Sequence, residues 1–191
     1  MKLANKNILV VGLGISGAAT ARFLKRRGAT VTVTDMSKPE SLGDYVPMMR
    51  ELGIRTEFGV HRTETFENAD FIVISPGVPH TIAPVKAARE RGVAVLGEIE
   101  LASRFIQEPI VAITGTNGKT TTTSLVGEML ESSGFNVFVG GNIGNPLIHY
   151  VDNGEKADIV VAEISSFQLD TIDTFSPDVG VLLNITADHL D

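Results

Sequence analysis

The residues best suited to chemistry lie in the middle of the chain, where glycines, hydroxyl groups and one lysine follow an apolar run. The stretch Gly115-Thr116-Asn117-Gly118-Lys119-Thr120-Thr121 comes after a predicted strand at 110–113 and before a predicted helix at 122–133 that Gly134 ends. A loop in this position offers backbone N–H groups and a helix N-terminus to phosphate oxygens. We therefore predict a nucleotide-phosphate site, with Lys119 on the outer phosphates and the Thr120 hydroxyl on Mg²⁺.

This loop departs from the full pattern Gly-x-x-x-x-Gly-Lys-Ser/Thr. Ile113 occupies the first glycine position, and the nearest glycine is Gly115. A glycine-rich turn with a surface lysine is the alternative interpretation. The position of Gly-Lys-Thr between a strand and a helix favours nucleotide binding.

A carboxylate for the metal is expected at the end of a neighbouring strand. The apolar run 158–162 ends at Glu163, so Glu163 is a candidate metal ligand; a strand-end carboxylate satisfied by its own neighbours is the alternative. A second apolar run, 179–183, ends at Asn184. Beyond it, His189 stands beside acidic residues, which makes a metal role plausible, although a lone histidine is more often structural.

A second glycine loop stands near the N-terminus. Gly12-Leu13-Gly14-Ile15-Ser16-Gly17 separates a predicted strand at 7–11 from a predicted helix at 18–27, and Asp35 ends the next strand at 30–34. This is the dinucleotide-binding pattern, in which the glycines allow a tight turn, close approach of a ligand and helix packing, and the acid binds a ribose or base. A plain turn with a solvated aspartate and the NAD site of a dehydrogenase are the alternatives.

The remaining pattern alternates strands and helices. This predicts an α/β fold with a parallel, doubly wound sheet, whose ligands gather at the carboxyl ends of the strands. The turn Ser75-Pro76-Gly77 lies at such an end, as do the Gly12 loop and Asp35. The spacing leaves open whether this turn contacts a ligand or only reverses the chain. The predicted strands are 54–58, 71–75, 93–96 and 136–139, and the predicted helices are 45–52, 82–91 and 98–105.

Composition limits the class of function. The chain has 191 residues, of which 43% are hydrophobic and 20% charged, as in ordinary globular proteins. The net charge of −7 argues against sequence-independent nucleic-acid binding. The absence of cysteine excludes thiolate catalysis and zinc–thiolate sites. No apolar run reaches the length of roughly 20 residues that a membrane helix needs, and we expect a cytoplasmic monomer.

Taken together, these segments resemble the superfamily of Mur ligases and folylpolyglutamate synthases, which join an amine to a carboxylate at the cost of ATP. The motif Glu-x-Ser-Ser-Phe-Gln-Leu is similar to that of the Mur ligases that add D-glutamate; a folylpolyglutamate-type ligase is the alternative within the superfamily. The segments that carry the resemblance are Gly115–Thr121, Gly140-Gly141-Asn142-Ile143-Gly144, Glu163-Ile164-Ser165-Ser166-Phe167-Gln168-Leu169 and Asn184-Ile185-Thr186-Ala187-Asp188-His189-Leu190-Asp191.

The resemblance implies two domains. Residues 1–97 would form a Rossmann-like domain that holds the UDP of the substrate rather than NAD. Residues 98–191 would form the first part of the P-loop ATP-binding α/β central domain. Because family members are considerably longer, we expect a truncated chain without the C-terminal domain, and without a carbamylated lysine that bridges the metals. Such a chain is expected to bind ligand but not to turn over, and to expose apolar faces at 159–162 and 179–183.

The resemblance also implies roles for single residues. Those assigned to ATP are Gly115, Thr116, Asn117, Gly118, Lys119, Thr120 and Thr121; those assigned to Mg²⁺ are Thr120, Glu163 and His189, with Asn142 near the reacting end. Those assigned to the UDP substrate are Gly14, Ile15, Ser16, Asp35, Ser75, Pro76 and Gly77. Met36 and Ser37 stand where the family often has threonine and arginine, and Lys38 could supply the missing cation.

The implied reaction adds D-glutamate to UDP-N-acetylmuramoyl-L-alanine in peptidoglycan biosynthesis. The substrate carboxylate would attack the γ-phosphate of ATP to form an acyl phosphate, and the amine of D-glutamate would then displace phosphate. Metal ions and lysine would position the reactants and neutralise charge, so no covalent nucleophile is required.

Overall fold

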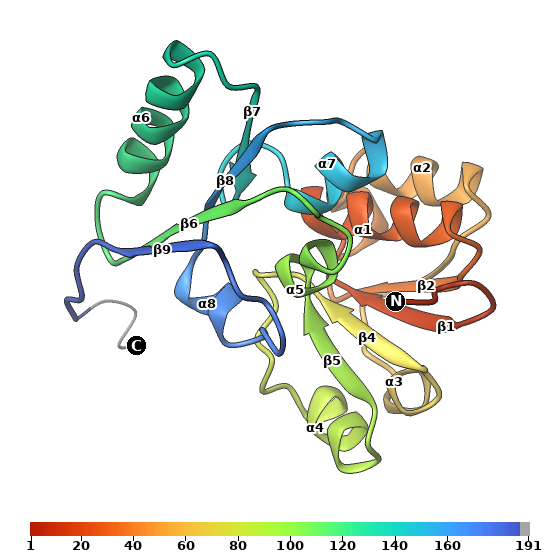
Figure 1. Ribbon diagram of the computed structural model, residues 1–191. Coiled ribbons are helices and arrows are strands. Elements are labelled where there is room, and N and C mark those ends of the chain that lie inside the picture. Colours follow the sequence, from red (N-terminus) through yellow and green to blue (C-terminus); the bar gives the residue numbers. More distant parts are fainter. Residues whose placement is uncertain (188–191) are drawn as a thin grey trace.

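Two parallel β-sheets, one in each half of the chain, organise the protein (Figure 1). These sheets, with the helices that connect their strands, confirm the predicted α/β class with parallel sheets. The computed structural model describes residues 1–187. His189, which the sequence predicts to bind a metal ion, lies outside the described residues.

The first sheet has five parallel strands in the order β3-β2-β1-β4-β5. The chain moves outward from β1 in one direction through β3 and then returns to the other side of β1 as β4. This reversal between β1 and β4 is the switch point at which doubly wound sheets bind ligands. The strands are β1 (Asn7–Val11), β2 (Thr30–Asp35), β3 (Arg55–Phe58), β4 (Phe71–Ile74) and β5 (Ala94–Gly97).

Helices cover both faces of this sheet (Figure 1). One face packs on α1 (Ile15–Arg26) and α2 (Tyr45–Glu51), which follows the 3₁₀ turn η1 (Pro39–Ser41). The other face packs on α3 (Thr63–Glu67) and α4 (Ala83–Glu90). Pro47 lies in the first turn of α2, where proline is tolerated because its missing N–H has no partner to lose.

The second sheet has four parallel strands in the order β7-β8-β6-β9. Its strands are β6 (Ile110–Thr114), β7 (Val137–Gly141), β8 (Ile159–Glu163) and β9 (Val179–Leu182). The helices of this half are α5 (Glu98–Ser103), α6 (Lys119–Ser132), α7 (Leu147–Asn153) and α8 (Ser166–Leu169). No helix within residues 1–187 is long and apolar enough to cross a membrane.

The predicted helix at 122–133 is present but begins earlier, at Lys119. Of the apolar residues whose helical spacing predicts it, Val126 and Leu130 are partly buried, whereas Leu125 and Met129 are 56% and 60% exposed. Thr123 and Gly127 are buried instead, because Gly127 has no Cβ and lets the helix approach Val139 of β7. Helical spacing therefore predicted the helix correctly, whereas its closest approach to the sheet is made by Thr123 and Gly127.

The expectation that 159–162 exposes an apolar face is wrong. Val160, Val161 and Ala162 are all 0% exposed, because β8 lies between β7 and β6. The edge strand β9 does expose apolar side chains, with Val179 and Leu182 at 50% and 60%. The short helices α3, α7 and α8 were not predicted from the sequence.

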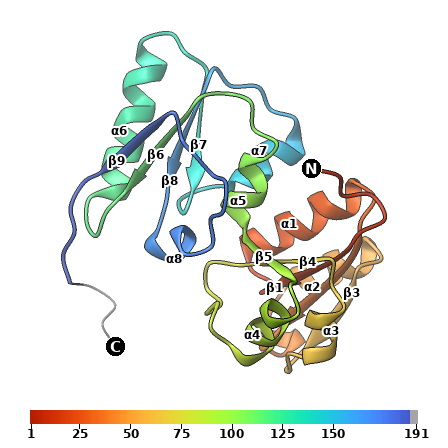
Figure 2. The same ribbon diagram turned by 60° about the horizontal axis from the view of Figure 1, so that its bottom comes forward.

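A single apolar core joins the two halves of the chain. It passes from α1 through α5 to α7, which lie side by side between the sheets (Figure 2). Phe23 of α1 is fully buried and meets the ring of Phe105 edge-on, with the ring centroids 5.2 Å apart. The fully buried side chains at this junction are Phe23, Leu24, Leu101, Leu147 and Ile148.

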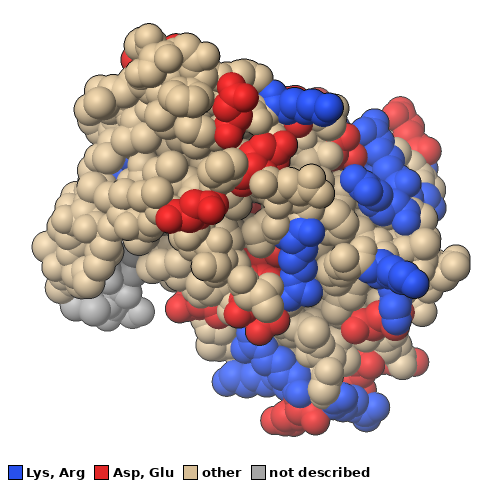
Figure 3. Space-filling model, viewed as in Figure 1, with Lys and Arg blue, Asp and Glu red and all other residues tan. Residues whose placement is uncertain are grey.

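Charge is distributed unevenly between the halves. Residues 1–97 contain 13 Lys and Arg against nine Asp and Glu, whereas residues 98–191 contain three against 14. In Figure 3 the blue side chains accordingly gather over the first sheet and its helices, and the region of α6 is almost free of them. The second half therefore has few cations of its own with which to balance a bound anion.

Glu100 of α5 binds the segment after α8 to the junction between the two halves of the chain. Its buried carboxylate accepts hydrogen bonds from the Arg104 Nε at 2.7 Å, from the Thr174 hydroxyl at 2.7 Å and from the backbone N–H groups of residues 173–175. Burial opposes ionisation of this group, but these donors outweigh burial and lower the pKa of Glu100 to about 2. Glu100 therefore stabilises the fold in its ionised form.

We predict that Glu100→Gln destabilises the protein in a pH-dependent way. Because the pKa in the folded state lies below the ordinary value of 4.5, the stabilisation is complete above pH 4.5 and disappears as the pH falls towards 2. Urea unfolding from pH 7 to pH 2 should show a difference in unfolding free energy that shrinks across this range. Glu90→Gln, on the exposed side of α4, is the control. A difference that stays constant to pH 2 would contradict the prediction.

Candidate functional site

The predicted phosphate loop connects β6 to α6. Gly118 immediately precedes the helix with φ of 85°, and Gly115 has φ of 144° and would place a Cβ 3.1 Å from the Cβ of Leu183. Both positions therefore require glycine. Lys119 is the first residue of the helix, and its Nζ donates hydrogen bonds to the Gly115 and Thr116 carbonyls at 2.8 and 2.9 Å. A phosphate oxygen in the loop would be a stronger, charged acceptor for the same ammonium group.

The segment after β9 holds this loop in shape. The Asn184 side chain accepts a hydrogen bond from the Asn117 N–H and donates one to the Asn117 carbonyl, both at 2.9 Å. Thr186 donates its N–H to the Thr116 hydroxyl at 3.0 Å. Sequence reasoning gave neither Asn184 nor Thr186 a role in the site. The available signal was the place of Asn184 at a strand end, the same signal that singled out Glu163.

Glu163 stands at the centre of a second group of predicted residues. Its carboxylate is 1% exposed and accepts hydrogen bonds from the Thr120 hydroxyl and the Asn142 amide, each at 2.7 Å. The three side chains come from the end of β8, the start of α6 and the loop after β7. A Cβ at Gly141 would overlap the Glu163 carbonyl, so a glycine is needed for this approach.

This group offers oxygen ligands of the kind that Mg²⁺ prefers. Glu163 is buried and makes no ion pair with a described Lys, Arg or His, so a cation would balance its charge. Within residues 1–187 no three His, Cys, Asp or Glu gather around one point. The oxygens of Glu163 and Thr120 would suit an ion that commonly keeps several waters and binds substrate phosphates.

The N-terminal glycine loop is shaped by close contacts. Gly12 has φ of 93°, and a Cβ at Gly17 would overlap the Gly12 carbonyl. A Cβ at Gly14 would meet no atom within 4 Å, so the space beside it is open. The helix α1 begins at the next residue, Ile15, which is 64% exposed. The open space at Gly14 therefore adjoins the start of a 12-residue helix, and a helix N-terminus is a favourable place for a phosphate.

Asp35 and Ser75 touch this loop from opposite sides. Asp35 accepts hydrogen bonds from the Leu13 N–H and the Ser37 N–H, both at 2.7 Å, and the Ser75 hydroxyl donates to the Gly12 carbonyl at 3.1 Å. Burial opposes ionisation of Asp35, but the two N–H groups and the nearby His61 outweigh it and lower its pKa. Asp35 is therefore an anion that orders the loop and keeps lone pairs for a ligand.

Ser16, which is predicted to bind UDP, and Met36, which stands where the family often has threonine, offer no free polar side-chain group to a ligand. The Ser16 hydroxyl is buried and has no hydrogen-bond partner among the described residues, which leaves its backbone N–H as the group available to a ligand. Met36 is 59% exposed and makes no polar contact through its side chain. The backbone N–H of the next residue, Ser37, donates its hydrogen bond to the Asp35 carboxylate.

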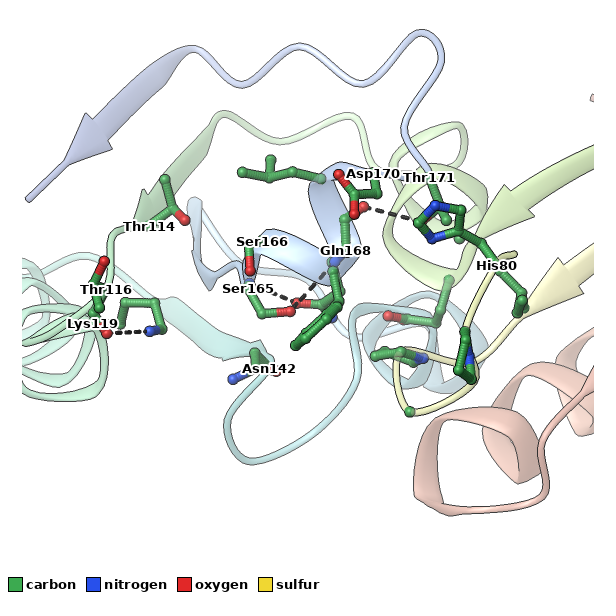
Figure 4. A pocket seen from close by; sticks show the side chains of 18 of the residues that line it. His80, Thr114, Thr116, Lys119, Asn142, Ser165, Ser166, Gln168, Asp170 and Thr171 are labelled. Atoms are coloured by element: carbon green, nitrogen blue, oxygen red, sulfur yellow. Dashed lines mark hydrogen bonds between the residues drawn. The ribbon is translucent and has the colours of Figure 1, made fainter. Parts of the chain in front are cut away.

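A cleft of about 980 Å³ joins the two sheets (Figure 4). The turn Ser75-Pro76-Gly77 lines one end, and Lys119 and Asn142 line the other. Ser165 and Gln168 of the α8 region point into the cleft between them, where they also cap that helix reciprocally. Gly14, Ile15, Ser16 and Asp35 are not among the lining residues. His80 and Glu98, which the sequence did not single out, also line the cleft.

Two Mur ligase family models match the chain. The model described as "Mur ligase MurD-like, N-terminal domain" matches residues 6–97, and the "Mur ligase middle domain" matches residues 113–191. The chain belongs to the Mur ligase family. The resemblance read from its motifs is thereby confirmed.

Curated relatives of this Mur ligase chain are longer than it is. It is 60% identical over its whole length to the UDP-N-acetylmuramoylalanine--D-glutamate ligase of Desulfatibacillum aliphaticivorans, and 56% identical to that of a Geobacter species. It spans 42% of the length of each.

Solved structures show the same fold. The chain is 26% identical to UDP-N-acetylmuramate-alanine ligase from Thermotoga maritima, with a TM-score of 0.55 over 97% of this chain and 43% of that one. It also matches UDP-N-acetylmuramate:L-alanyl-gamma-D-glutamyl-meso-diaminopimelate ligase from Neisseria meningitides, with 21% identity and a TM-score of 0.59, over 98% of this chain and 63% of that one.

We predict that Gly17→Ala destabilises the N-terminal glycine loop. The added methyl group would overlap the Gly12 carbonyl, and forced overpacking of this kind costs on the order of 1–3 kcal/mol. Gly14→Ala is the matched control, because its methyl group would enter open space at a negative φ. Equal losses of unfolding free energy in urea for the two variants would show that the Gly17 contact is not required.

Proposed function

We propose that this chain carries the substrate-binding and ATP-binding parts of a ligase that adds D-glutamate to UDP-N-acetylmuramoyl-L-alanine. The observation that supports this most strongly is the cleft between the sheets. It joins the Ser75-Pro76-Gly77 turn of the first sheet to Lys119 and Asn142 of the second. A substrate anchored by its nucleotide on the first sheet would thus extend its free end towards the phosphate loop. The names of the relatives indicate the same substrate.

Each half would have its own task. We assign residues 1–97 to a domain for the UDP substrate and residues 98–191 to part of the central ATP-binding domain, because β5 ends at Gly97 and α5 begins at Glu98. In the first, the open space at Gly14 would admit the diphosphate to the N-terminus of α1, and Asp35 would accept a hydrogen bond from the nucleoside. Ser75-Pro76-Gly77 would line the path towards the second sheet.

In the second half, the phosphate loop would bind ATP. The amides of residues 115–121 and the Lys119 ammonium group would hold the phosphates, while Thr120 and Glu163 would hold Mg²⁺, which when bound neutralises charge on the transferred phosphoryl group. Lys119 is the single Lys or Arg among the residues that line the cleft. One lysine cannot balance a triphosphate, which favours a divalent cation at Glu163. His189 stays a predicted second metal ligand.

The chemistry would proceed in two steps without a protein nucleophile. A carboxylate oxygen of the L-alanyl substrate attacks the γ-phosphorus, the bond to ADP breaks, and an acyl phosphate results. The amine of D-glutamate then attacks the carbonyl carbon and loses a proton as phosphate leaves. The chain would contribute by holding the reacting groups in line, since orientation of this kind can lower a barrier by roughly 7–11 kcal/mol.

We predict selective binding of uridine nucleotide by the first half. Titration with UDP-N-acetylmuramoyl-L-alanine, UDP and NAD should give saturable binding of the two uridine compounds. Gly14→Val should abolish it without unfolding the protein, because the side chain would fill the open space beside the start of α1. Saturable binding of NAD with no response to UDP would instead favour a dehydrogenase, and turnover with a folate would favour a folylpolyglutamate-type ligase.

We predict that Lys119→Ala in the full-length protein weakens Mg²⁺·ATP binding and abolishes turnover. The lost interaction is a charge-assisted contact to phosphate worth on the order of 2 kcal/mol, or roughly thirtyfold in affinity. Lys156→Ala removes an exposed lysine of the same half of the chain and is the matched control. Normal phosphate release from ATP by the Lys119 variant would refute the assignment.

A further inference from the structure

The helix α7 is held at its start by the first residue of α5 and at its end by α1. It belongs to the second half, yet Leu147 and Ile148 in its first turn are 0% exposed within the core that α1 and α5 share. A helix of seven residues has little stability of its own and takes its position from what it packs against. The contacts at its two ends therefore decide where it lies.

Glu98 holds the beginning of α7. This first residue of α5 is 2% exposed, and its Oε1 accepts a hydrogen bond from the Ile148 N–H at 2.6 Å. Its Oε2 is buried and has no partner among the described residues. The neighbouring Gly97 N–H donates to the Thr171 carbonyl at 3.1 Å, so the β5–α5 connection contacts both α7 and the segment after α8.

Asp152 holds the end of α7. Its carboxylate, whose side chain is 3% exposed, accepts hydrogen bonds from the Arg22 Nε at 2.7 Å and the Arg26 Nη1 at 3.2 Å. Both arginines lie on α1, the helix that begins at the N-terminal glycine loop. Each end of α7 is thus fixed by a carboxylate: its start is bound to Glu98 of α5 in the same half, and its end is bound through Asp152 to α1 of the first half.

The helix α7 in turn positions the loop that contains Asn142. Only residues 142–146 separate β7 from α7. Within this loop Asn142 donates its side-chain amide to the Glu163 Oε1 at 2.7 Å and its backbone N–H to the Glu163 carbonyl at 2.9 Å. A shift of the first turn of α7 would therefore move Asn142 against the Glu163 carboxylate.

Glu98 is buried at a cost in free energy, and what α7 receives from it is a hydrogen-bond acceptor. A buried carboxyl oxygen without a partner costs free energy, and burial raises the pKa of this group to about 7. Glutamine would accept the same hydrogen bond from Ile148 without a buried charge. Locally unfavourable choices of this kind in folded proteins tend to be found at functional sites.

We propose that Glu98 is a positioning residue for the Glu163 site: by fixing the first turn of α7, it holds Asn142 against the carboxylate that would bind Mg²⁺·ATP. This proposal rests on the proposed function for the role of Glu163. The geometric part, coupling of position 98 to Asn142, is independent of any ligand. Residues that orient a metal ligand through a hydrogen bond typically change metal affinity by about 10- to 100-fold when they are removed.

The test compares Glu98→Ala with Glu98→Gln in the full-length protein. Hydrogen exchange of the Ile148 and Asn142 amides should accelerate in the alanine variant and stay slow in the glutamine variant, which keeps the acceptor. Affinity for Mg²⁺·ATP, measured by calorimetry, should fall about tenfold in the alanine variant and recover with glutamine.

Glu57→Ala is the matched control, because it removes a buried carboxylate of β3 that Arg55 and Thr65 hold, away from α7. It should lower stability without changing Mg²⁺·ATP affinity or Asn142 exchange. If the Glu98→Ala protein does not fold, Asp152→Asn at the other end of α7 should speed Asn142 exchange in the same way.

Two results would overturn the proposal. One is faster exchange at Ile148 with no change at Asn142, which would mean that Glu98 only packs α7. The other is an unchanged Mg²⁺·ATP affinity in Glu98→Ala while the Asn142 amide exchanges faster. If the unmodified protein does not bind Mg²⁺·ATP, the proposed function fails, whereas the exchange measurements still decide whether Glu98 positions Asn142.

Discussion

The packing of α5 and α7 against α1 is the constraint on which the rest of the structure depends. Each sheet could satisfy its own backbone, but the cleft exists only because the sheets are held at a set distance and angle. That arrangement rests on a continuous apolar core containing Phe23, Leu101 and Ile148, and apolar burial of this extent is the dominant stabilising term in folding. Polar contacts at the junction also fix the orientation of α7, since Glu98 and Asp152 accept hydrogen bonds of defined geometry.

The second constraint is the shared edge of parallel strands. Loops after β1 and β4 meet in the first sheet, and loops after β6, β7 and β8 meet in the second, because all of these strands run in the same direction. The Ser75 hydroxyl therefore reaches the Gly12 carbonyl. The side chains of Thr120 and Asn142 both reach the Glu163 carboxylate. The same geometry gathers a buried anion and a phosphate loop in a half of the chain that is short of cations. A divalent metal ion would resolve that imbalance.

Predictions from the sequence were most reliable where one residue type has one physical use. The glycines of both loops were recognised because positive φ and close contacts require them, as at Gly12, Gly115 and Gly118. The buried strands were recognised from continuous apolar runs. The burial of 159–162 was misjudged, because hydrophobicity does not say which neighbour will cover a side chain. The fold and the ends of the strands were therefore predictable, while the packing partners were not.

The sequence by itself determined the α/β class, the two glycine loops with their lysine and acids, and the family, because backbone conformation and strand ends follow from local residue types. Only the tertiary structure decided that Asn184 and Thr186 brace the phosphate loop and that the Ser16 hydroxyl points inwards. It alone brought Glu98 to Ile148, 50 residues away. The reason is physical: such contacts depend on how separate elements pack, and no local spacing in the chain encodes which distant group a buried carboxylate will meet.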